Sequence, residues 1–477
     1  MNKTLLIGAA ASAAILSTSC AENQPTKCGE KPNVIVVLLD DLGSNDVGFR
    51  GSVDIITPNI DRIANEGANC TDAYISAPYS GPSRCGLMTG RYQQRFGAEA
   101  NADSDQAALD MKQGVLESEV LLGELLKENG YKTAAIGKWH LGDHPDLWPQ
   151  NRGFDYFYGF SGGGHNFWGG AKNLEKNPSA FVQENGRMIP ASETTYLTDD
   201  FSNKAVEFID KSAKDGDPFF VYLAYNAPHA PLQAPQKYLD RTEHIYNQYR
   251  SVYAAMILAV DDGVGEIWEA LERHGIEDNT MIIFLSDNGG VGINGQTSNL
   301  PHRSFKGNMF DGGIHTPFAF YWKGAIHPGT VYDKTISSLD IYATVATAAG
   351  VDVSKVKNPL DGVDLIPYLS GKDKGNPHTT LFWRVIGGKE YAVRKGDYKL
   401  VKTYYDDNLQ LYNVKEDMIE RVNIAAANPD IVKDMAADYK AWNAQLMTPR
   451  WADAHEKHQH IDHEEWAKYR KKASGGR

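Results

Sequence analysis

The stretch Asn33-Val34-Ile35-Val36-Val37-Leu38-Leu39-Asp40-Asp41 does most to define the fold of this chain. After Asn33, the run to residue 39 is apolar and mostly β-branched, which is typical of a strand buried on both faces of a parallel sheet. Asp40 and Asp41 follow where that strand ends. We therefore expect a central parallel sheet that carries two carboxylates at the carboxyl end of one strand.

Similar apolar runs recur along the chain and alternate with helical patterns. We expect strands at 131–136, 218–225, 281–285 and 317–322 and helices at 118–129, 246–274 and 336–349, with Ser118 as the N-cap of the first helix. This alternation predicts an α/β fold with crossover connections, whose ligands bind beyond the carboxyl ends of the strands. Four strands, the first included, end in polar residues, so we place the functional site there.

The pattern of the sequence changes after about residue 375. Short strand-like runs at 381–384, 391–394, 398–402 and 409–412 are separated by turns, and a helical pattern follows at 430–446. We expect a large domain over residues 32–375 and a small subdomain over 376–477, built from an antiparallel sheet and a packing helix. The charged tail from residue 450 holds His455, His458, His460 and His463, for which a solvated helix is favoured over a metal site.

The first residues form a targeting pattern rather than part of the fold. Lys3 precedes an apolar run at 5–15 that is too short to cross a membrane as a stop-transfer helix. Leu16-Ser17-Thr18-Ser19-Cys20 is similar to a bacterial lipobox, although Leu16 stands one place further from the cysteine than usual. We expect a lipoprotein signal peptide over 1–19, a lipidated Cys20 and a polar tether over 20–31, with ordinary secretion as the alternative. The protein would then be exported and held in the periplasm or at the cell surface, touching the membrane only through its lipid.

Composition limits the classes of partner. The formal net charge is −13, which argues against nucleic acid as a partner. A local cluster of basic side chains can still attract an acidic substrate within a Debye length of about 8 Å. Apart from Cys20, the odd set Cys28, Cys70 and Cys85 argues against a disulfide framework, while the pair Cys70–Cys85 stays open.

Ser80-Gly81-Pro82-Ser83-Arg84 is the most informative motif of the chain. Pro82 suits the first turn of a helix, where its missing N–H group is no loss. The free amides of that turn and the guanidinium of Arg84 would face an anion held beside Ser80. Cys85, which follows directly, is expected to be a small buried residue of the helix.

A set of oxygen ligands accompanies this motif. Asp40, Asp41, Asp287 and Asn288 offer carboxylate and amide oxygens without thiolate or imidazole, which suits Ca²⁺ or Mg²⁺ better than Zn²⁺. Taken singly, each pair is equally well explained as a helix cap or a turn. Their joint occurrence with the Ser80 motif favours a metal site.

Basic residues complete the candidate site. Lys138 and His140 flank Trp139 and would point to the same side if that run is extended. His229 lies between two prolines in Ala-Pro-His-Ala-Pro, and Lys306 begins the run Lys-Gly-Asn-Met-Phe-Asp-Gly-Gly. Taken alone, any of these residues could be incidental.

The order of these motifs over residues 31–415 resembles the type I, formylglycine-dependent sulfatases of the alkaline-phosphatase-like superfamily. The resemblance implies a large mixed, mostly parallel sheet flanked by helices. It also implies that Ser80 is oxidised to formylglycine (3-oxoalanine). One position departs from the common family pattern: His315 stands where arginine is more frequent, which bears on substrate fit. Asp311 stands at a position where the family has glutamate or aspartate.

The resemblance also implies a role for each motif residue. Asp40, Asp41, Asp287, Asn288 and the converted Ser80 would bind Ca²⁺, with Mg²⁺ as the second choice. Arg84 would stabilise the formylglycine, and Lys138 and Lys306 would hold sulfate oxygens. His229 is favoured as the acid that protonates the leaving oxygen, and His140 would accept the other proton.

The implied activity is hydrolysis of sulfate esters with release of inorganic sulfate. Similarity to bacterial polysaccharide sulfatases favours a sulfated glycan as the substrate, and Trp168 and Trp383 could either stack on its sugar rings or serve in packing. A serine at position 80 implies maturation by the anaerobic radical-SAM sulfatase-maturating enzyme. The alternatives are a phosphomonoesterase or phosphodiesterase of the same superfamily, using unmodified Ser80 and zinc, and a glycan-binding protein that has lost catalysis.

Overall fold

The computed structural model describes residue 1 and residues 31–169 and 181–452. The signal peptide, nearly all of the tether and the four histidines of the charged tail lie outside these ranges, so they stay predictions. Within the described ranges, no helix combines the length and the apolar character needed to cross a membrane.

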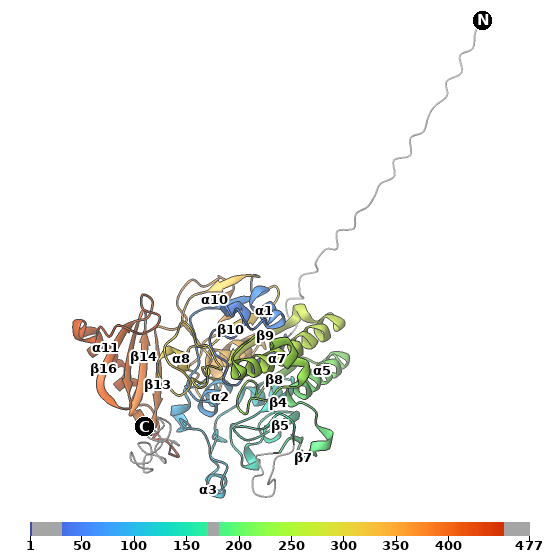
Figure 1. The fold of residues 1–477 in the computed structure, drawn as a ribbon, viewed down its shortest axis with the longest axis horizontal. Helices are drawn as coiled ribbons and strands as arrows, with labels where there is room; N and C mark the ends of the chain where they lie inside the picture. The colour runs from blue at the N-terminus through green and yellow to red at the C-terminus, as the bar shows by residue number, and fades with distance from the viewer. Residues whose placement is uncertain (2–30, 170–180, 453–477) are drawn as a thin grey trace.

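A ten-stranded sheet forms the centre of the molecule (Figure 1). Its order is β11 (Thr330–Tyr332), β2 (Ala68–Cys70), β10 (Phe318–Tyr321), β9 (Thr280–Ser286), β1 (Asn33–Leu39), β8 (Phe219–Ala224), β4 (Lys132–Lys138), β5 (Tyr156–Phe160), β6 (Gln183–Glu184) and β7 (Arg187–Met188). Strands β9, β1, β8, β4 and β5 run parallel, whereas β10 is antiparallel to β9. The predicted mixed, mostly parallel sheet is therefore confirmed.

Helices cover both faces of this sheet. Because side chains alternate along a strand, Ile35, Val37 and Leu39 of β1 join one buried cluster and the residues between them join the other. The first cluster includes helices α1 (Pro58–Asn65), α5 (Leu197–Asp215) and α7 (Gln248–His274), and the second includes α2 (Ser80–Thr89), α4 (Leu122–Glu128) and α9 (Asp340–Ala348). Shorter helices are α3 (Gln106–Asp110), α6 (Gln236–Leu239), α8 (Asp311–Ile314) and α10 (Ile366–Leu369), and β3 (Ala73–Tyr74) pairs with β12 (Ile336–Ser337).

A second sheet lies beside the first, drawn in orange at the left of Figure 1. It is an antiparallel meander of β13 (Thr380–Val385), β14 (Glu390–Lys395), β15 (Tyr398–Thr403) and β16 (Asp406–Asn413), and α11 (Pro429–Asn443) packs on it. The predicted C-terminal sheet and helix are thus present. Leu381 and Trp383 join the buried cluster of the central sheet, so the two sheets pack as one body. The boundary placed at residue 375 stays a prediction.

Two sequence-based helix predictions were wrong at their beginnings. Helix α4 begins at Leu122 rather than Ser118, because the Glu124 side chain accepts from the Leu121 amide while Arg152 Nη2 donates to the Glu119 carbonyl. The helix expected from residue 336 begins at Asp340, whose Oδ2 accepts from the Ser337 amide at the end of a short strand. In both places a side-chain acceptor holds the preceding backbone outside the helix.

Both cysteines in the described ranges are free. Cys70 ends β2 and Cys85 lies in α2, and each is buried. The pairing left open by the sequence is therefore absent, and Cys85 is a packed helix residue as expected.

Candidate active site

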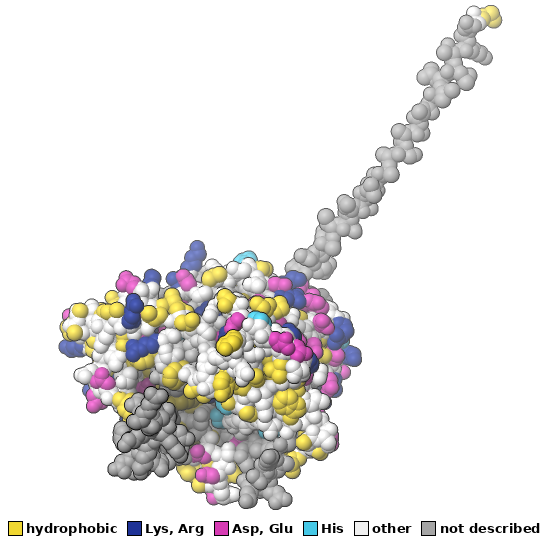
Figure 2. Space-filling view, in the orientation of Figure 1, with side chains coloured by type: hydrophobic (Ala, Val, Ile, Leu, Met, Phe, Trp, Pro, Cys, Tyr) yellow, Lys and Arg dark blue, Asp and Glu magenta, His cyan; other side chains and the backbone are white. Residues whose placement is uncertain are grey.

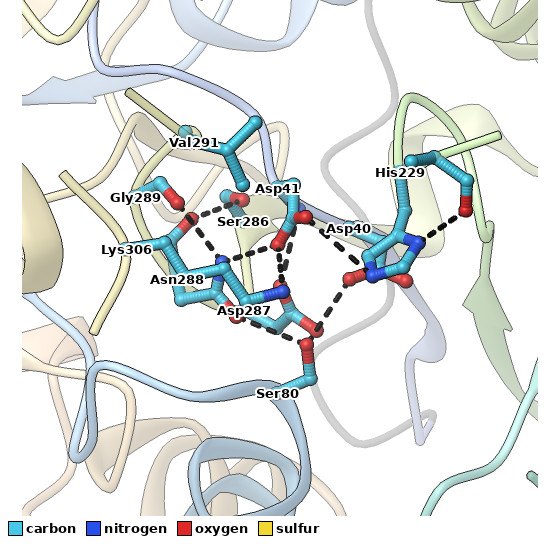
Figure 3. A network of polar contacts seen from close by, with 12 residues as sticks. Asp40, Asp41, Ser80, His229, Ser286, Asp287, Asn288, Gly289, Val291 and Lys306 are labelled. Carbon is cyan, nitrogen blue, oxygen red and sulfur yellow. Dashed lines mark hydrogen bonds and ion pairs between the residues drawn. The ribbon is translucent and has the colours of Figure 1, made fainter. Parts of the chain in front are cut away.

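Ser80 stands at the carboxyl edge of the central sheet, where four parallel strands end side by side. It is the first residue of α2 and is almost fully buried. Its Oγ lies 3.1 Å from Asp40 Oδ1, just after β1, and 3.0 Å from Asn288 Oδ1, just after β9 (Figure 3). The hydroxyl is therefore held among oxygen atoms from two neighbouring strands.

The predicted oxygen ligands converge on this hydroxyl. Asn288 Nδ2 donates to Asp41 Oδ1 at 2.6 Å, and the Asp41 amide lies 3.4 Å from Asp287 Oδ1. All four ligand residues are at most 3% exposed. Asp41 has a φ of 64°, in the left-handed region that residues other than glycine rarely adopt. Such backbone strain concentrates at functional sites, and here it turns Asp41 toward the cluster.

Each carboxylate of the cluster is paired with a basic side chain. Lys138 Nζ lies 2.6 Å from Asp40 Oδ2 and Lys306 Nζ lies 2.6 Å from Asp41 Oδ1, while Arg84 Nη2 lies 2.8 Å from Asp287 Oδ2. Three negative and three positive charges are thus buried together. The pairing compensates for the loss of solvation that an isolated buried charge would suffer.

The electrostatics keep the carboxylates of Asp40 and Asp41 ionised. Burial is the largest single influence and raises the pKa values of Asp40 and Asp41. The combined attraction to nearby basic groups, with Lys138 foremost for Asp40 and Lys306 for Asp41, outweighs it and lowers both pKa values below the ordinary value. Burial lowers the pKa of Lys306, but Asp41 raises it above its ordinary value overall. Both carboxylates are therefore charged at neutral pH and can act as metal ligands.

The two predicted histidines lie on either side of the cluster. His229 Nε2 lies 3.6 Å from Asp41 Oδ2, and its Nδ1 lies 2.6 Å from the Ala230 carbonyl, to which it donates. Strand β4 ends at Lys138 and His140 takes a φ of 57°, so the extended alternation expected through residue 140 stops short of it. Even so, the ring of His140 lies beside Gly81, the neighbour of Ser80.

His140 and His229 differ in burial. Burial lowers the pKa of His140 well below its ordinary value, and the charges of Lys138 and Arg84 lower it further. Its Nδ1 is buried and has no hydrogen-bond partner. His140 is therefore a neutral imidazole that can accept a proton, whereas His229 is about a quarter exposed at the mouth of the site.

Comparison with known proteins identifies the family. The family model described as Sulfatase matches residues 32–351. The chain belongs to the sulfatase family. A second model, described as N-sulphoglucosamine sulphohydrolase, C-terminal, matches residues 302–445. The protein is accordingly a sulfuric ester hydrolase, and its fold is that of the alkaline-phosphatase-like proteins.

Individual sulfatases agree with this assignment. The Uncharacterized sulfatase YdeN of Escherichia coli (strain K12) is 33% identical over 492 residues, covering 85% of this chain and 84% of that protein. N-acetylgalactosamine-6-sulfatase of Mus musculus is 33% identical over 387 residues, covering 78% of this chain and 72% of that protein.

Among solved structures, Ps i-CgsB superposes with a TM-score of 0.83 at 38% identity, covering 90% of this chain and 96% of that chain. Its complex with k-i-k-neocarrahexaose superposes with a TM-score of 0.82 at 37% identity, covering 94% of this chain and 98% of that chain.

The donor set of this sulfatase fits a hard cation. Carboxylate, amide and hydroxyl oxygens from Asp40, Asp41, Asp287, Asn288 and Ser80 lie together, and such a set suits Ca²⁺ or Mg²⁺. Asp40, Asp41 and His229 also offer ligand atoms that all lie within 4.8 Å of one another. A role of His229 as a metal ligand therefore stands beside its predicted role in proton transfer.

The sulfatase has site residues that sequence reasoning missed. Strand β5, which pairs with β4, ends at Phe160, and a run of three glycines follows over residues 162–164. A Cβ atom at Gly163 would lie 2.7 Å from His140 Nε2, so only glycine lets the loop approach this ring. Asn101 Oδ1 accepts from the Gly81 amide at 2.9 Å. The glycine run at a strand end was a visible signal, whereas nothing in the sequence marked Asn101.

Three other residues were singled out in the sequence, and within the part of the chain that the structure describes none of them hydrogen-bonds to Ser80 or to its oxygen ligands. Trp383 is buried and donates from Nε1 to the Ile75 carbonyl, so its role is packing. His315 donates from Nε2 to the Thr71 carbonyl and lines a cavity of about 400 Å³ between β2 and the C-terminal sheet. The suggestion that His315 bears on substrate fit at Ser80 thus lacks a contact to support it. Trp168 is 45% exposed, so its stacking role stays open.

The face of the molecule drawn in Figure 2 is hollowed in one place. Figure 2 shows a hollow below the centre of the molecule, in which histidine side chains are visible. Acidic and basic side chains are interspersed over the same face. Within the site, Arg84, Lys138 and Lys306 place three positive charges beside the three carboxylates.

Proposed function

We propose that this sulfatase hydrolyses sulfate esters on a sulfated poly- or oligosaccharide and releases inorganic sulfate. In this proposal residue 80 is formylglycine made from Ser80, and Ca²⁺ is held by Asp40, Asp41, Asp287, Asn288 and residue 80. The observation that carries the proposal is the convergence of a buried hydroxyl, four oxygen ligands and three basic side chains at one sheet edge. The neocarrahexaose complex of Ps i-CgsB supports a sulfated glycan as the substrate class.

Ca²⁺ and formylglycine would supply positive charge and a nucleophilic hydroxyl beside the substrate sulfur. The side chains of the chain itself do the remaining work. Lys138 and Lys306 bind and orient the sulfuryl oxygens, and Arg84 stabilises the formylglycine. All three stabilise the charge that develops on the sulfuryl oxygens. Their fixed pairing with carboxylates orients them before the substrate arrives, so little reorganisation is needed during the reaction.

Each histidine moves one proton. His229 donates Nδ1–H to the Ala230 carbonyl, which leaves Nε2 directed into the site. From this atom it would protonate the leaving oxygen of the substrate, and its exposed position at the mouth suits contact with the sugar side of the ester. His140, neutral and without a partner at Nδ1, would act as the base.

Maturation requires a partner. Because residue 80 is encoded as serine, we propose that the anaerobic radical-SAM sulfatase-maturating enzyme oxidises it. Protein made in a host without that enzyme would fold but stay inactive. Comparing activity with and without coexpressed maturase tests this step, and equal activity in both hosts would refute it.

We also infer that the protein is exported and anchored by a lipid on Cys20. The support is the apolar run and lipobox-like sequence before that residue. Labelling of cells with a fatty acid should mark the wild-type protein, and Cys20→Ser should release an unlabelled protein from the membrane fraction. Labelling that survives Cys20→Ser would contradict the anchor.

The experiment for the main proposal compares ester classes. Matured protein should release sulfate from a defined set of sulfated oligosaccharides and from an aryl sulfate, and Ser80→Ala should release none. An aryl phosphate serves as the test of the alternative, a phosphoesterase with unmodified Ser80. Phosphatase activity that exceeds sulfatase activity and needs no maturation of Ser80 would overturn the proposal.

A further inference from the structure

Lys306 sits on a closed loop whose two ends meet. The Gly312 amide donates to the Arg303 carbonyl at 2.7 Å, which closes the segment from 303 to 312 into a ring. A Cβ atom at Gly312 would lie 2.2 Å from the Ser304 carbonyl oxygen, so the ring closes only with glycine at this position. At the far side, the Lys306 amide donates to the Gly290 carbonyl at 3.1 Å.

The base of this loop is fixed to the C-terminal sheet. Lys399 of β15 lies 2.5 Å from Asp311 Oδ1 and 2.8 Å from Glu420 Oε1 through its Nζ. The Asp311 amide donates to Glu420 Oε2 at 2.7 Å. Arg303, at the other end of the loop, donates to the Glu420 carbonyl at 2.7 Å. Both ends of the 303–312 loop are thus held by one cluster, which consists of Lys399, Asp311 and Glu420.

This cluster is as buried as the active site. The side chains of Lys399 and Glu420 are 0% exposed and that of Asp311 is 3% exposed. Buried charges of this kind hold their partners in fixed positions, because a charge that lost its partner would stay buried without compensation. Among the residues that the structure describes, Lys399 is the one whose ammonium pairs with both carboxylates, so it decides whether they can stay together.

We propose that Lys399 is a positioning residue that holds Lys306 at Asp41 by clamping the base of the 303–312 loop through Asp311 and Glu420. The C-terminal sheet then acts on the reaction through the position of Lys306. This inference rests on the proposed function, since it takes Lys306 as a residue that binds the sulfate.

The test is a double-mutant cycle of Lys399→Met with Lys306→Ala, measured on an aryl sulfate. Misplacement of a catalytic group by about 1 Å can lower the rate by about 10²-fold, so we expect a loss of that order in kcat, with little change in KM, for Lys399→Met alone. In the Lys306→Ala background, Lys399→Met should lower kcat by less than about 3-fold, because the ammonium group that Lys399 positions is absent there. Equal loss in both backgrounds would overturn the proposal.

Arg384→Met is the matched control. Arg384 also reaches from the C-terminal sheet into a buried ion pair, 2.8 Å from Glu99 Oε2, but none of its bonds reaches the 303–312 loop. We expect it to lower the unfolding temperature and to leave kcat near the wild-type value. A loss of kcat equal to that of Lys399→Met would assign the effect to general destabilisation and overturn the proposal.

A second readout does not depend on activity. Amide hydrogen exchange of peptides covering residues 303–312 should speed up in Lys399→Met and stay unchanged in Arg384→Met. If Lys399→Met does not fold, Glu420→Gln keeps the side-chain shape and should give the same changes to a smaller extent. Wild-type exchange in the loop of either folded variant would refute the clamp. Failure of the proposed function would instead appear as a wild-type protein, matured at Ser80, that is inactive on every sulfate ester.

Discussion

Arg84 and Asp287 form a fully buried ion pair in which Nε and Nη2 both lie 2.8 Å from Oδ2. The pair joins the first turn of α2 to the end of β9. Arg84 also donates from Nη1 to the Lys138 carbonyl at 3.1 Å, so it contacts the end of a third element. One guanidinium therefore ties together the segments that carry Ser80, Asp287 and Lys138.

Arg84→Lys should abolish most activity although it keeps the charge. An ammonium cannot reproduce the planar donors that reach Asp287 and the Lys138 carbonyl together. We expect sulfate release to fall by about 10²–10³-fold, the usual effect of losing one preorganised charge donor. The unfolding temperature should also fall, because Asp287 loses part of its pairing. Arg91→Lys, at the partly buried ion pair with Glu119 beyond the end of α2, should change activity little. Wild-type activity of Arg84→Lys would contradict this arrangement.

Removal of the metal should inactivate the enzyme reversibly. A chelator would remove the cation and leave the three buried carboxylates of the site without it. Sulfate release should therefore stop, and it should return when Ca²⁺ is added. Binding to the folded state alone should raise stability by about 2.7 kcal/mol at a hundredfold excess over Kd. Thermal unfolding with chelator and with added Ca²⁺ measures this shift. A shift of the same size in Asp41→Asn would place the cation elsewhere.

His229→Gln separates the two roles open to this residue. If His229 protonates the leaving oxygen, Ca²⁺ content stays at the wild-type level while kcat falls by about 10²–10⁴-fold on a sugar sulfate. The loss should be smaller on an aryl sulfate with an acidic leaving group, which needs less protonation. Elemental analysis and kinetics on both esters decide the matter. Loss of the metal in His229→Gln would make it a ligand instead.

The ion pair of His378 with Asp340 should make stability depend on pH. Nε2 lies 2.7 Å from Oδ1, and although burial works to lower the pKa of His378, Asp340 raises it above 6.5 overall. Its contribution to stability is therefore fully present below the unfolded-state pKa and is lost as pH rises through the folded-state pKa. His378→Gln should lower the unfolding temperature more at about pH 5 than at about pH 8. A larger effect at the alkaline end would contradict this assignment.

The sequence predicted the strand ends better than the connections between them. The apolar runs before Asp40 and Asp287 predicted the central parallel sheet. A short run that is apolar throughout is typical of a strand that is buried on both faces. The beginning of α4 could not be foreseen, since it depends on Arg152 and Glu124 meeting in space. Local propensity marks Ser118 as an N-cap, and tertiary contacts override it.

The candidate site could likewise be predicted only in part from the sequence. Ser80 and its oxygen ligands were identified by residue type and order, and the structure brings them together. Gly163 carries no chemistry of its own, and its importance comes only from the closeness of the His140 ring. The Lys399 clamp was out of reach as well, because its partner Asp311 begins helix α8 and lies 88 residues away along the sequence.

The mass of the peptide that contains Ser80, measured on the same preparation whose sulfate release is assayed, tests the account most directly. The account predicts that active protein carries a residue lighter than serine by two hydrogen atoms, and that the converted fraction tracks the activity across preparations made with and without the maturase. Full sulfatase activity in protein whose residue 80 has the unmodified serine mass would contradict it.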